Sequence, residues 1–164
     1  MKRTVTALLL SIACTTAIAA QTSSTQTATK ITDSAKLETF KLPDSALNIA
    51  LWHDPASGPQ RSTLKESQVV LFVHGATISG KLSAGYAIDG YSWSRDVANS
   101  GRDAWVVDLP GYGRSDDYPE MRKADAHATS DPVGNAKSLV PVLDAAVDYI
   151  LKQSGAKKLT IIAT

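Results

Sequence analysis

VVLFVHGATISGKLS, residues 69–83, is the stretch on which the fold of this 164-residue chain depends. Its first five residues are a continuous β-branched and apolar run, which predicts a strand buried on both faces. The loop that follows opens with His74 and Gly75 and continues to Gly80 and Lys81. A loop that leaves the end of a buried strand can hold a phosphate or stabilise an oxyanion. The rest of the sequence is needed to decide between these two functions.

Four further strands are predicted on either side of this stretch, in addition to the strand it contains. Residues 36–51 alternate apolar and other side chains on either side of a Pro-Asp-Ser turn at 43–45, and this period predicts a β-hairpin. Ala104–Val107 and KKLTIIAT, residues 157–164, are predicted to be a second and a third buried strand.

A short helix is predicted within SWSRDVANSG, residues 92–101. Ser92 or Ser94 can cap its start, and Gly101 stands where a helix would stop. The residues predicted to form its apolar face are Trp93, Val97 and Ala98.

A second, longer helix is predicted to begin at Asp131-Pro132, because a capping carboxylate is followed by proline at the first helical position. Apolar residues keep helical spacing from there to Gly155, and Pro141 is expected to kink or restart the helix. The predicted order is a hairpin followed by β-α-β-α-β, which builds a parallel sheet with helices on both faces. Ligands in such sheets bind beyond the carboxyl ends of the strands.

The first twenty residues predict export. They have a basic start, a short apolar stretch and an Ala-Ile-Ala site at 17–19, as in a secretory signal peptide. An acylated Cys14 is the alternative, but Ser11 stands where a lipoprotein usually has leucine. Removing residues 1–19 takes away two basic residues and changes the formal net charge from +1 to −1. Residues 20–35 are Thr- and Ser-rich and are predicted to be a flexible leader.

Composition excludes several classes of function. Cys14 is the only cysteine, so the mature protein is expected to have no disulfide, thiolate nucleophile or Cys-ligated zinc. A formal charge near zero gives no indication of binding to nucleic acid or to an anionic membrane. Asp125 and His127 lie in a polar run without ligand spacing, so no metal site and no cofactor are predicted. The expected partner is a small-molecule substrate, with no membrane span, and no pattern predicts an oligomeric state.

A nucleotide-binding P-loop is one interpretation of the loop after residue 73. Gly75, Gly80 and Lys81 have the required spacing, but position 82 is leucine and lacks the hydroxyl that ligates Mg²⁺. A P-loop also needs a helix that opens at once toward the phosphates. The glycines at 85 and 90 disfavour such a helix, at about 1 kcal/mol each.

A dinucleotide-binding turn is a second interpretation, based on Gly111, Gly113 and the residues after them. The third glycine position of that motif holds Asp116, whose side chain would block close helix–strand packing and repel a pyrophosphate. No helix is predicted directly after this turn either.

A third interpretation uses both loops together. VVLFVHGAT (69–77) and VVDLPGYGRSD (106–116) resemble the α/β-hydrolase superfamily, in which an HG-x loop follows the third strand and a D-x-x-G-x-G-x-S turn follows the fourth. The resemblance covers residues 36–164 and implies the N-terminal portion of an α/β-hydrolase fold. It implies hydrolysis of an ester or a related bond through a nucleophile-acid-His triad and a backbone oxyanion hole.

The resemblance also implies roles for individual residues. It makes the backbone N–H of Ala76 an oxyanion-hole donor. Gly75 and Thr77 are predicted to contact the substrate, with a capping or turn role as the alternative for the Thr77 hydroxyl. His74 is expected to brace this loop by hydrogen bonds rather than to act as the catalytic base. Ser115 is expected to be a structural hydroxyl, and the residues that shape the turn are Asp108, Gly111 and Gly113.

The nucleophile, acid and base are not in this sequence, since no G-x-S-x-G elbow occurs in residues 1–164. Residues 158–164 resemble the strand that runs directly into the elbow, so the nucleophile is expected directly after Thr164. The chain as written is therefore expected to be a fragment without activity. A non-catalytic binding module on a hydrolase-like fold is the alternative from another class of function.

Overall fold

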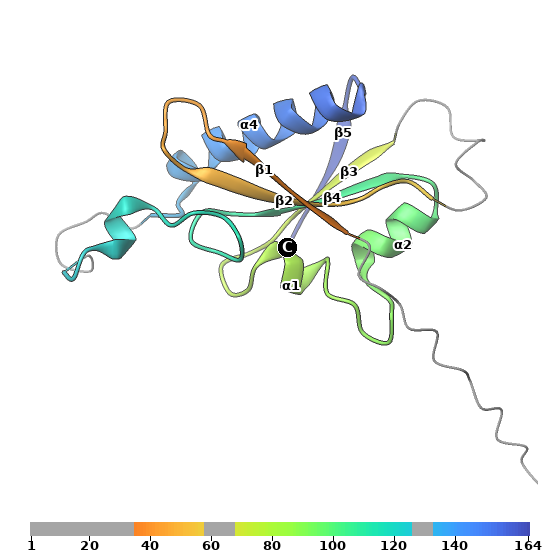
Figure 1. Ribbon diagram of the computed structural model, residues 1–164, viewed down its shortest axis with the longest axis horizontal. Helices are drawn as coiled ribbons and strands as arrows, with labels where there is room; N and C mark the ends of the chain where they lie inside the picture. The colour runs from red at the N-terminus through yellow and green to blue at the C-terminus, as the bar shows by residue number, and fades with distance from the viewer. Residues whose placement is uncertain (1–34, 58–67, 126–132) are drawn as a thin grey trace, which may run out of the picture.

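The computed structural model describes residues 35–57, 68–125 and 133–164 (Figure 1). The predicted signal peptide, nearly all of the leader, His127 and the predicted helix start at Asp131-Pro132 lie outside these residues. Five strands form one sheet in the order β1-β2-β4-β3-β5. The strands are β1 (Lys36–Lys41), β2 (Asn48–Asp54), β3 (Val69–Val73), β4 (Asp103–Asp108) and β5 (Leu159–Ala163). The helices are α1 (Gly80–Ser83), α2 (Trp93–Asn99), the 3-10 helix η1 (Pro119–Arg122) and α4 (Ala136–Ser154).

The predicted hairpin is confirmed. β1 pairs antiparallel with β2, and the turn between them is closed by a 3.2 Å hydrogen bond from the Ser45 N–H to the Leu42 carbonyl. Pro43 presets the φ angle of the first central position, and Asp44 takes a φ of 54° at the second. β2 then pairs antiparallel with β4, whereas β3 is parallel to both β4 and β5. The hairpin is therefore an antiparallel extension of a parallel sheet.

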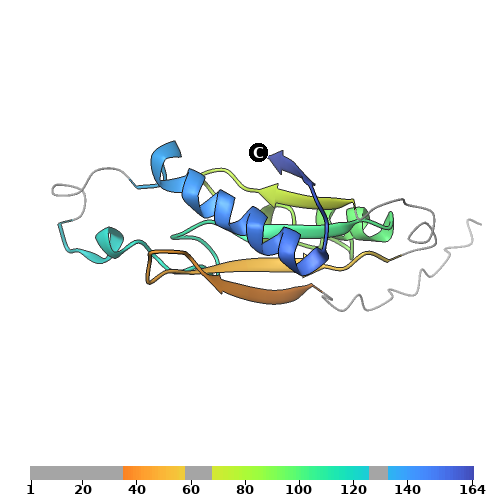
Figure 2. The same cartoon turned by 90° about the horizontal axis from the view of Figure 1, so that it is seen from above.

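The continuous apolar run of β3 is explained by helices on both faces of the sheet. α4 covers one face, and α1 and α2 lie on the other (Figures 1 and 2). Successive strand side chains point to opposite faces, so Leu71 packs in the core beneath α4 while Phe72 packs in the core beside α1 and α2. The prediction of a strand buried on both faces is confirmed, since every residue of β3 is buried.

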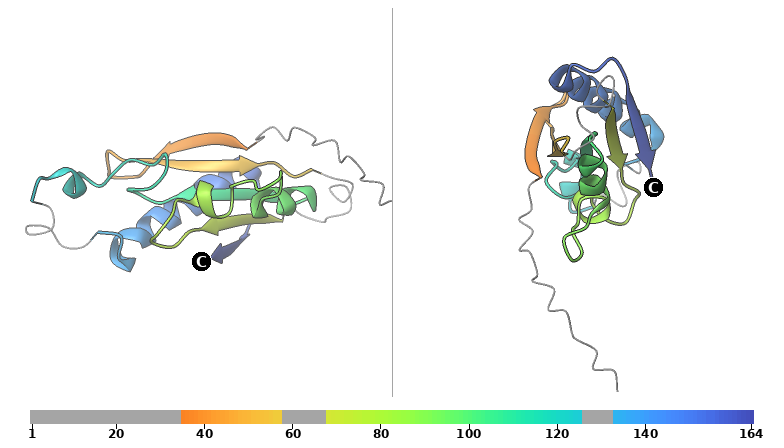
Figure 3. Two further views of the ribbon diagram at one scale, coloured as in Figure 1. Left: turned by 90° about the horizontal axis from the view of Figure 1, so that it is seen from below. Right: turned by 90° about the vertical axis from the view of Figure 1, so that its right-hand side faces the viewer.

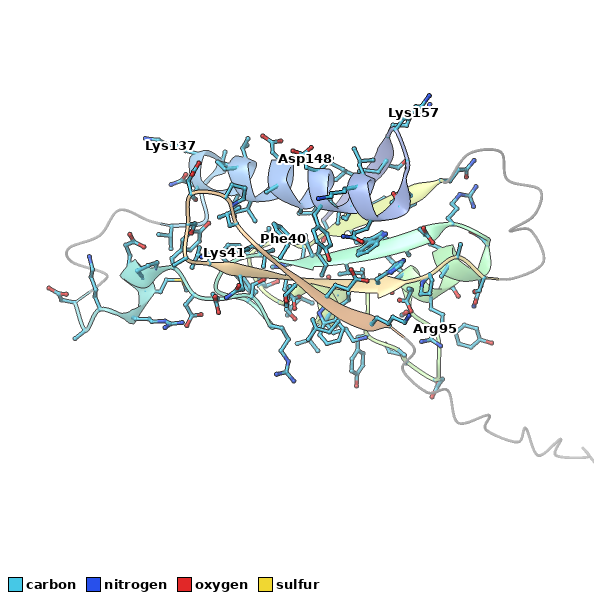
Figure 4. All side chains as sticks on the ribbon, turned by 45° about the horizontal axis from the view of Figure 1, so that its top comes forward. Phe40, Lys41, Arg95, Lys137, Asp148 and Lys157 are labelled. Carbon is cyan, nitrogen blue, oxygen red and sulfur yellow. The ribbon has the colours of Figure 1, made fainter. Side chains whose placement is uncertain are left out.

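The apolar stripe of α4 packs on the sheet through Val142, Ala146 and Ile150. On the hairpin side, the Phe40 ring stacks on Tyr149 with centroids 5.1 Å apart. Lys137, Asp148 and Lys157 project away from the sheet, whereas Phe40 lies on the side that α4 covers (Figure 4). This arrangement has the amphipathic spacing that the sequence predicts.

β5 differs from its prediction as a buried strand. It pairs with β3, but Ile161 is 50% exposed and Ile162 is 36% exposed. The reason is its place at the edge of the sheet: α4 packs over β2, β3 and β4, and of β5 only Leu159 reaches that core. In the part of the chain that the structure describes, apolar composition therefore marks β5 as a strand without marking its burial.

The start of α2 is confirmed at Ser92, whose hydroxyl accepts a 3.2 Å hydrogen bond from the Arg95 N–H. Its predicted apolar face is wrong in one member, because Trp93 is 60% exposed. Ser94 is fully buried instead and donates a 2.7 Å hydrogen bond to the Asp54 carboxylate on β2. This bond fixes the side of α2 that faces the sheet, and Trp93, one position earlier, therefore faces outward.

α4 begins at Ala136, with the Asn135 side chain accepting a 3.2 Å hydrogen bond from the Ser138 N–H as its cap. Pro141 does not restart the helix, because α4 runs through it as one element. Pro141 lies on the exposed side of α4 near its start, where the missing N–H affects a single intrahelical bond. The predicted end at Gly155 is confirmed: with φ of 71° it donates to the Leu151 carbonyl at 2.9 Å.

α1 is a helical turn that the sequence does not predict. Ser79 caps it through a bond from the Leu82 N–H, and Gly80 lies against the backbone of β4. A Cβ at position 80 would stand 2.2 Å from the Val107 carbonyl oxygen and 2.8 Å from a Val106 methyl carbon. Only glycine permits this approach, so α1 sits directly on the sheet.

Gly80→Ala is expected to lower the free energy of unfolding by about 3 kcal/mol, because the atoms it would meet include backbone that cannot move aside. Gly85→Ala is the control, since its new Cβ would meet the flexible Lys81 side chain at 3.1 Å and the Lys81 carbonyl at 3.2 Å. Urea denaturation of both variants measures the difference. Equal losses would show that α1 adjusts freely on the sheet.

Candidate functional site

The strand order places a site at the carboxyl end of β3. From β3 the chain passes to β4 on one side, and it returns through α4 to β5 on the other side. β5 lies beside β3 at the edge of the sheet (Figure 3). Such reversals of strand order, with helices on opposite faces, form the crevice where ligands bind in α/β sheets.

Two segments far apart in sequence meet at this crevice. The Thr164 N–H donates a 3.1 Å hydrogen bond to the Val73 carbonyl, which continues the β3–β5 pairing to residue 164. Gly75 lies against it, since a Cβ there would stand 2.9 Å from the Thr164 carbonyl oxygen. The loop after β3, residues 74–79, is hereafter called the β3 loop. Glycine at 75 allows this loop to touch the end of β5.

His74 connects the β3 loop to the turn after β4. Its side chain is buried, and its Nε2 accepts a 3.0 Å hydrogen bond from the Leu109 N–H. Its Nδ1 lies 2.6 Å from the Gly75 carbonyl oxygen. Both bonds are satisfied by the neutral tautomer with its proton on Nδ1, which we assign from this pattern. With both ring nitrogens engaged, His74 holds the two loops together.

The turn after β4 spans residues 108–116 and is hereafter called the β4 turn. Its first residue, Asp108, makes the hydrogen bonds that hold the turn to other elements. Its carboxylate is fully buried. It accepts hydrogen bonds from the Trp52 indole at 2.9 Å, the Lys81 N–H at 3.1 Å and the Arg114 N–H at 3.1 Å. One carboxylate thus joins β2, α1 and the β4 turn, and each bond is of the strong, charge-assisted kind.

These contacts oppose the P-loop interpretation, although a helical turn does open at Gly80. The Asp108 carboxylate accepts the Lys81 N–H at the start of α1, where a P-loop would bind its phosphate. The Lys81 ammonium lies 4.8 Å from the centroid of the Trp52 ring. Both groups of Lys81 that would serve a nucleotide are therefore engaged within the fold.

The two glycines of the β4 turn have positive φ angles, 86° at Gly111 and 56° at Gly113. A Cβ at 113 would stand 2.2 Å from the Asp108 carboxylate, so glycine is needed for that carboxylate to fit. Ser115 donates to the Asp108 carbonyl and accepts a 2.8 Å hydrogen bond from the Ala50 N–H. Its hydroxyl is used within the fold and is not displayed as a nucleophile.

Asp116 closes the β4 turn on β2 rather than opening a helix. Its carboxylate accepts from the backbone N–H of Asn48 at 2.8 Å and from the Asn48 side chain at 2.9 Å. The bond from the backbone N–H of Asn48, and then the bond from its side chain, lower the pKa of the Asp116 carboxyl. The next element is the 3-10 helix η1 at 119–122, so a dinucleotide-binding helix does not follow the turn.

The β3 loop displays free amide hydrogens. In residues 35–57, 68–125 and 133–164, no protein acceptor receives the N–H of any residue from Gly75 to Ile78. These four residues are exposed. The Ala76 carbonyl, in contrast, accepts a hydrogen bond from the Tyr112 hydroxyl in the β4 turn. The carbonyls of Gly75 and Ala76 are therefore held by side chains, whereas the N–H groups of residues 75–78 are available to a ligand.

Two cavities flank the β3 loop. One, of about 290 Å³, is lined by His74, Gly75 and Ala76 together with Tyr112, Tyr118 and Leu139. The other, of about 250 Å³, is lined by Phe72, Trp93 and Ile162 and reaches Thr164. A larger hollow of about 850 Å³ lies at the opposite ends of β3 and β5, beside Arg102 and Lys157. Its place at the amino ends of the strands separates it from the β3 loop and the β4 turn, so we place the candidate site at the smaller cavities.

The sequence singled out His74, Gly75, Ala76 and Asp108, which the structure places in the β3 loop and at the β4 turn, but it did not single out Trp52 or Tyr112. The motif leaves the position of Tyr112 unspecified, and Trp52 lies on a distant strand. Only the hydrogen bonds of the folded chain reveal that both side chains contact the loops.

Within the described residues, no group of three His, Cys, Asp or Glu side chains is arranged to hold a metal ion. Among the same residues, no helix has the length and apolar character required to cross a membrane.

Comparison with known proteins agrees with this architecture. No family model and no curated protein matches the sequence. Among solved structures, an alpha/beta hydrolase, GrgF, from Penicillium sp. sh18 is similar at 17% identity and a TM-score of 0.55, covering 79% of this chain and 37% of its own. A thioesterase domain from the curacin biosynthetic pathway has 16% identity and a TM-score of 0.50, covering 79% and 35%. The Cif epoxide hydrolase from Acinetobacter nosocomialis has 13% identity and a TM-score of 0.50, covering 79% and 30%.

The sheet and its switch-point crevice define an α/β protein whose loops at the carboxyl ends of the strands form the candidate site. More specifically, the chain has the N-terminal portion of the α/β-hydrolase fold, as the sequence resemblance implied. It spans about a third of the length of the structures that it resembles.

Proposed function

We propose that the protein containing this chain is an exported hydrolase that cleaves ester bonds. The observation that supports this most directly is the β3 loop: His74 braces it, the Ala76 N–H has no acceptor among the described residues, and Gly75 touches Thr164. A donor fixed before charge develops is what acyl transfer requires. Export rests on the pattern of residues 1–19 alone.

The proposed chemistry places a nucleophile directly after Thr164, at the tip of the crevice. Its attack on the carbonyl carbon would create an oxyanion, which the Ala76 N–H would stabilise while Gly75 and Thr77 contact the substrate. The acid and the histidine of the triad would come from later parts of the protein, in the chain order Ser/Asp/Cys, acid, His. Residues 1–164 alone are therefore expected to show no turnover.

The ester is favoured because the loop offers backbone donors to the anionic oxygen that forms during acyl transfer. The thioesterase domain among the similar structures is named for an acyl substrate, and an epoxide hydrolase has the same fold. The 290 Å³ cavity beside the loop, which is lined mainly by apolar and aromatic side chains, suits a small acyl or alkyl group.

The proposal is tested on the full-length protein with p-nitrophenyl acetate, a short acyl thioester and styrene oxide. We expect ester turnover and, after acid quenching, an acyl adduct found by mass spectrometry on the residue that follows Thr164. A folded protein that turns over none of the three and forms no adduct would contradict the proposal. Stabilisation of such a protein by bound ester alone would support the non-catalytic binding module instead.

A further inference from the structure

Two side chains hold consecutive peptide groups of the β3 loop by their carbonyl oxygens. His74 Nδ1 contacts the carbonyl of Gly75, which belongs to the same peptide group as the Ala76 N–H. The Tyr112 hydroxyl donates to the carbonyl of Ala76, which belongs to the same peptide group as the Thr77 N–H. Each brace therefore controls the direction of one specific amide hydrogen.

The direction follows from peptide geometry. The described chain has no cis peptide bond, and in a trans peptide the C=O and the N–H point in opposite directions. The His74 and Tyr112 rings touch edge to face, with centroids 4.8 Å apart. Because the two rings lie together, both carbonyls are drawn to one side of the loop. The Ala76 and Thr77 amide hydrogens then point to the other side.

We propose that Tyr112 is a positioning residue, which holds the Ala76–Thr77 peptide so that the Thr77 N–H joins the Ala76 N–H as a second oxyanion donor from the same loop. This inference rests on the proposed function. The Thr77 N–H has no acceptor in the part of the chain that the structure describes, and Thr77 is exposed. Tyr112 acts through the loop and does not touch the reacting atoms.

The sequence supplies a matched pair of tyrosines for the test. Tyr118 lines the same 290 Å³ cavity as Tyr112, but its hydroxyl donates to the Ser138 carbonyl at 3.4 Å rather than to the β3 loop. Tyr112→Phe and Tyr118→Phe each remove one hydroxyl from this cavity. Only the first removes a bond to the Ala76 carbonyl.

The experiment measures the peptide bond and the reaction separately in the full-length protein. Labelling with ¹³C-carbonyl alanine and ¹⁵N-threonine gives NMR cross-peaks only from Ala-Thr bonds, of which residues 1–164 contain four, at 28–29, 76–77, 128–129 and 163–164. Loss of one cross-peak in Ala76→Ser assigns the 76–77 bond. Steady-state ester hydrolysis gives kcat and KM.

We expect Tyr112→Phe to shift the 76–77 cross-peak and to lower kcat on the order of 10-fold, since a misdirected donor is lost chiefly in the transition state. KM is expected to change less than about twofold, because ground-state binding does not use this donor. Tyr118→Phe is expected to leave the 76–77 cross-peak unmoved and to lower kcat less than Tyr112→Phe does, because it removes a hydroxyl from the cavity without releasing the Ala76 carbonyl.

The outcomes separate this inference from the function on which it rests. An unmoved 76–77 cross-peak in Tyr112→Phe, or a shifted one with unchanged kcat, would overturn the role of Tyr112 as a positioning residue. If Tyr112→Phe shifts the 76–77 cross-peak but the wild-type protein hydrolyses no ester, the positioning of the peptide would be sustained and the proposed function overturned. Equal losses of kcat in both variants would overturn the inference in favour of a general effect on the cavity.

Discussion

Asp108→Asn is expected to lower the free energy of unfolding by about 3 kcal/mol, although it changes the size of the side chain very little. The two carboxylate oxygens have different partners: Oδ1 accepts from the Lys81 N–H, and Oδ2 accepts from the Trp52 indole and the Arg114 N–H. An amide has one oxygen, so it keeps two bonds at best. Its NH₂ group then faces the Lys81 N–H, so that two buried hydrogen-bond donors face each other without an acceptor.

The loss of stability in Asp108→Asn is expected to be concentrated at the start of α1. The best orientation of the asparagine keeps its oxygen toward Trp52 and Arg114, which leaves the start of α1 without its acceptor. The remaining bonds also fall from charge-assisted to neutral strength, which is roughly a halving of each. We therefore expect the first turn after Ser79 to lose protection from amide hydrogen exchange before the rest of the sheet does.

Asp117→Asn is the matched control, since it makes the same chemical change in an exposed side chain. Asp117 pairs with Arg122 at 3.5 Å, and both side chains are about half or more exposed, at 49% and 65%. Such pairs contribute between about 0 and 1 kcal/mol. Urea denaturation of both variants, followed by tryptophan fluorescence, measures the difference. Equal unfolding free energies would show that Asp108 is not the centre of the β4 turn.

The arrangement around Asp108 shows how far the sequence alone could go. The resemblance implied that Asp108, Gly111 and Gly113 shape the turn after β4, and the structure has positive φ at both glycines. The identity of the three donors could not be predicted, because Trp52 and Lys81 lie on other elements. Motif spacing specifies a local backbone path, whereas side-chain partners depend on how distant elements pack.

β5 and α1 show a different limit. Apolar composition identified β5 as a strand, but burial depends on what covers it, and within the described residues β5 is an exposed edge. The glycines at 85 and 90 disfavour a helix after the β3 loop, yet the helical turn α1 forms at Gly80–Ser83, where Gly80 lies close against β4. Helix propensity is a weak preference of about 1 kcal/mol, and close packing on a sheet outweighs it.

The β3 loop is identified by its sequence pattern, yet its proposed chemistry depends on a feature that no sequence pattern contains. His74 and Gly75 mark the end of β3, and the resemblance implies that Ala76 is the donor. The structure adds that the N–H groups of residues 75–78 lack protein acceptors among the described residues. This combination supports a direct test of a single hydrogen atom.

Replacement of the Ala76 backbone N–H by an ester oxygen is expected to lower kcat for ester hydrolysis by about 10²- to 10³-fold, the usual effect of removing one oxyanion donor. The change is made in the full-length protein by incorporating lactic acid at position 76, which keeps the methyl side chain. The His74 bond to the Gly75 carbonyl remains possible, although an ester carbonyl accepts it more weakly. KM is expected to change little, because the donor acts mainly in the transition state.

The same substitution at Ala46 is the control. Ala46 lies in the exposed hairpin turn between β1 and β2, and its N–H has no protein acceptor in the described chain. Removing that N–H therefore changes one exposed backbone group outside the β3 loop and is expected to leave kcat within about twofold. If lactic acid at 76 lowered kcat no more than lactic acid at 46, the β3 loop would not be the oxyanion donor. Ester hydrolysis, if present, would then have to draw its donors from another part of the protein.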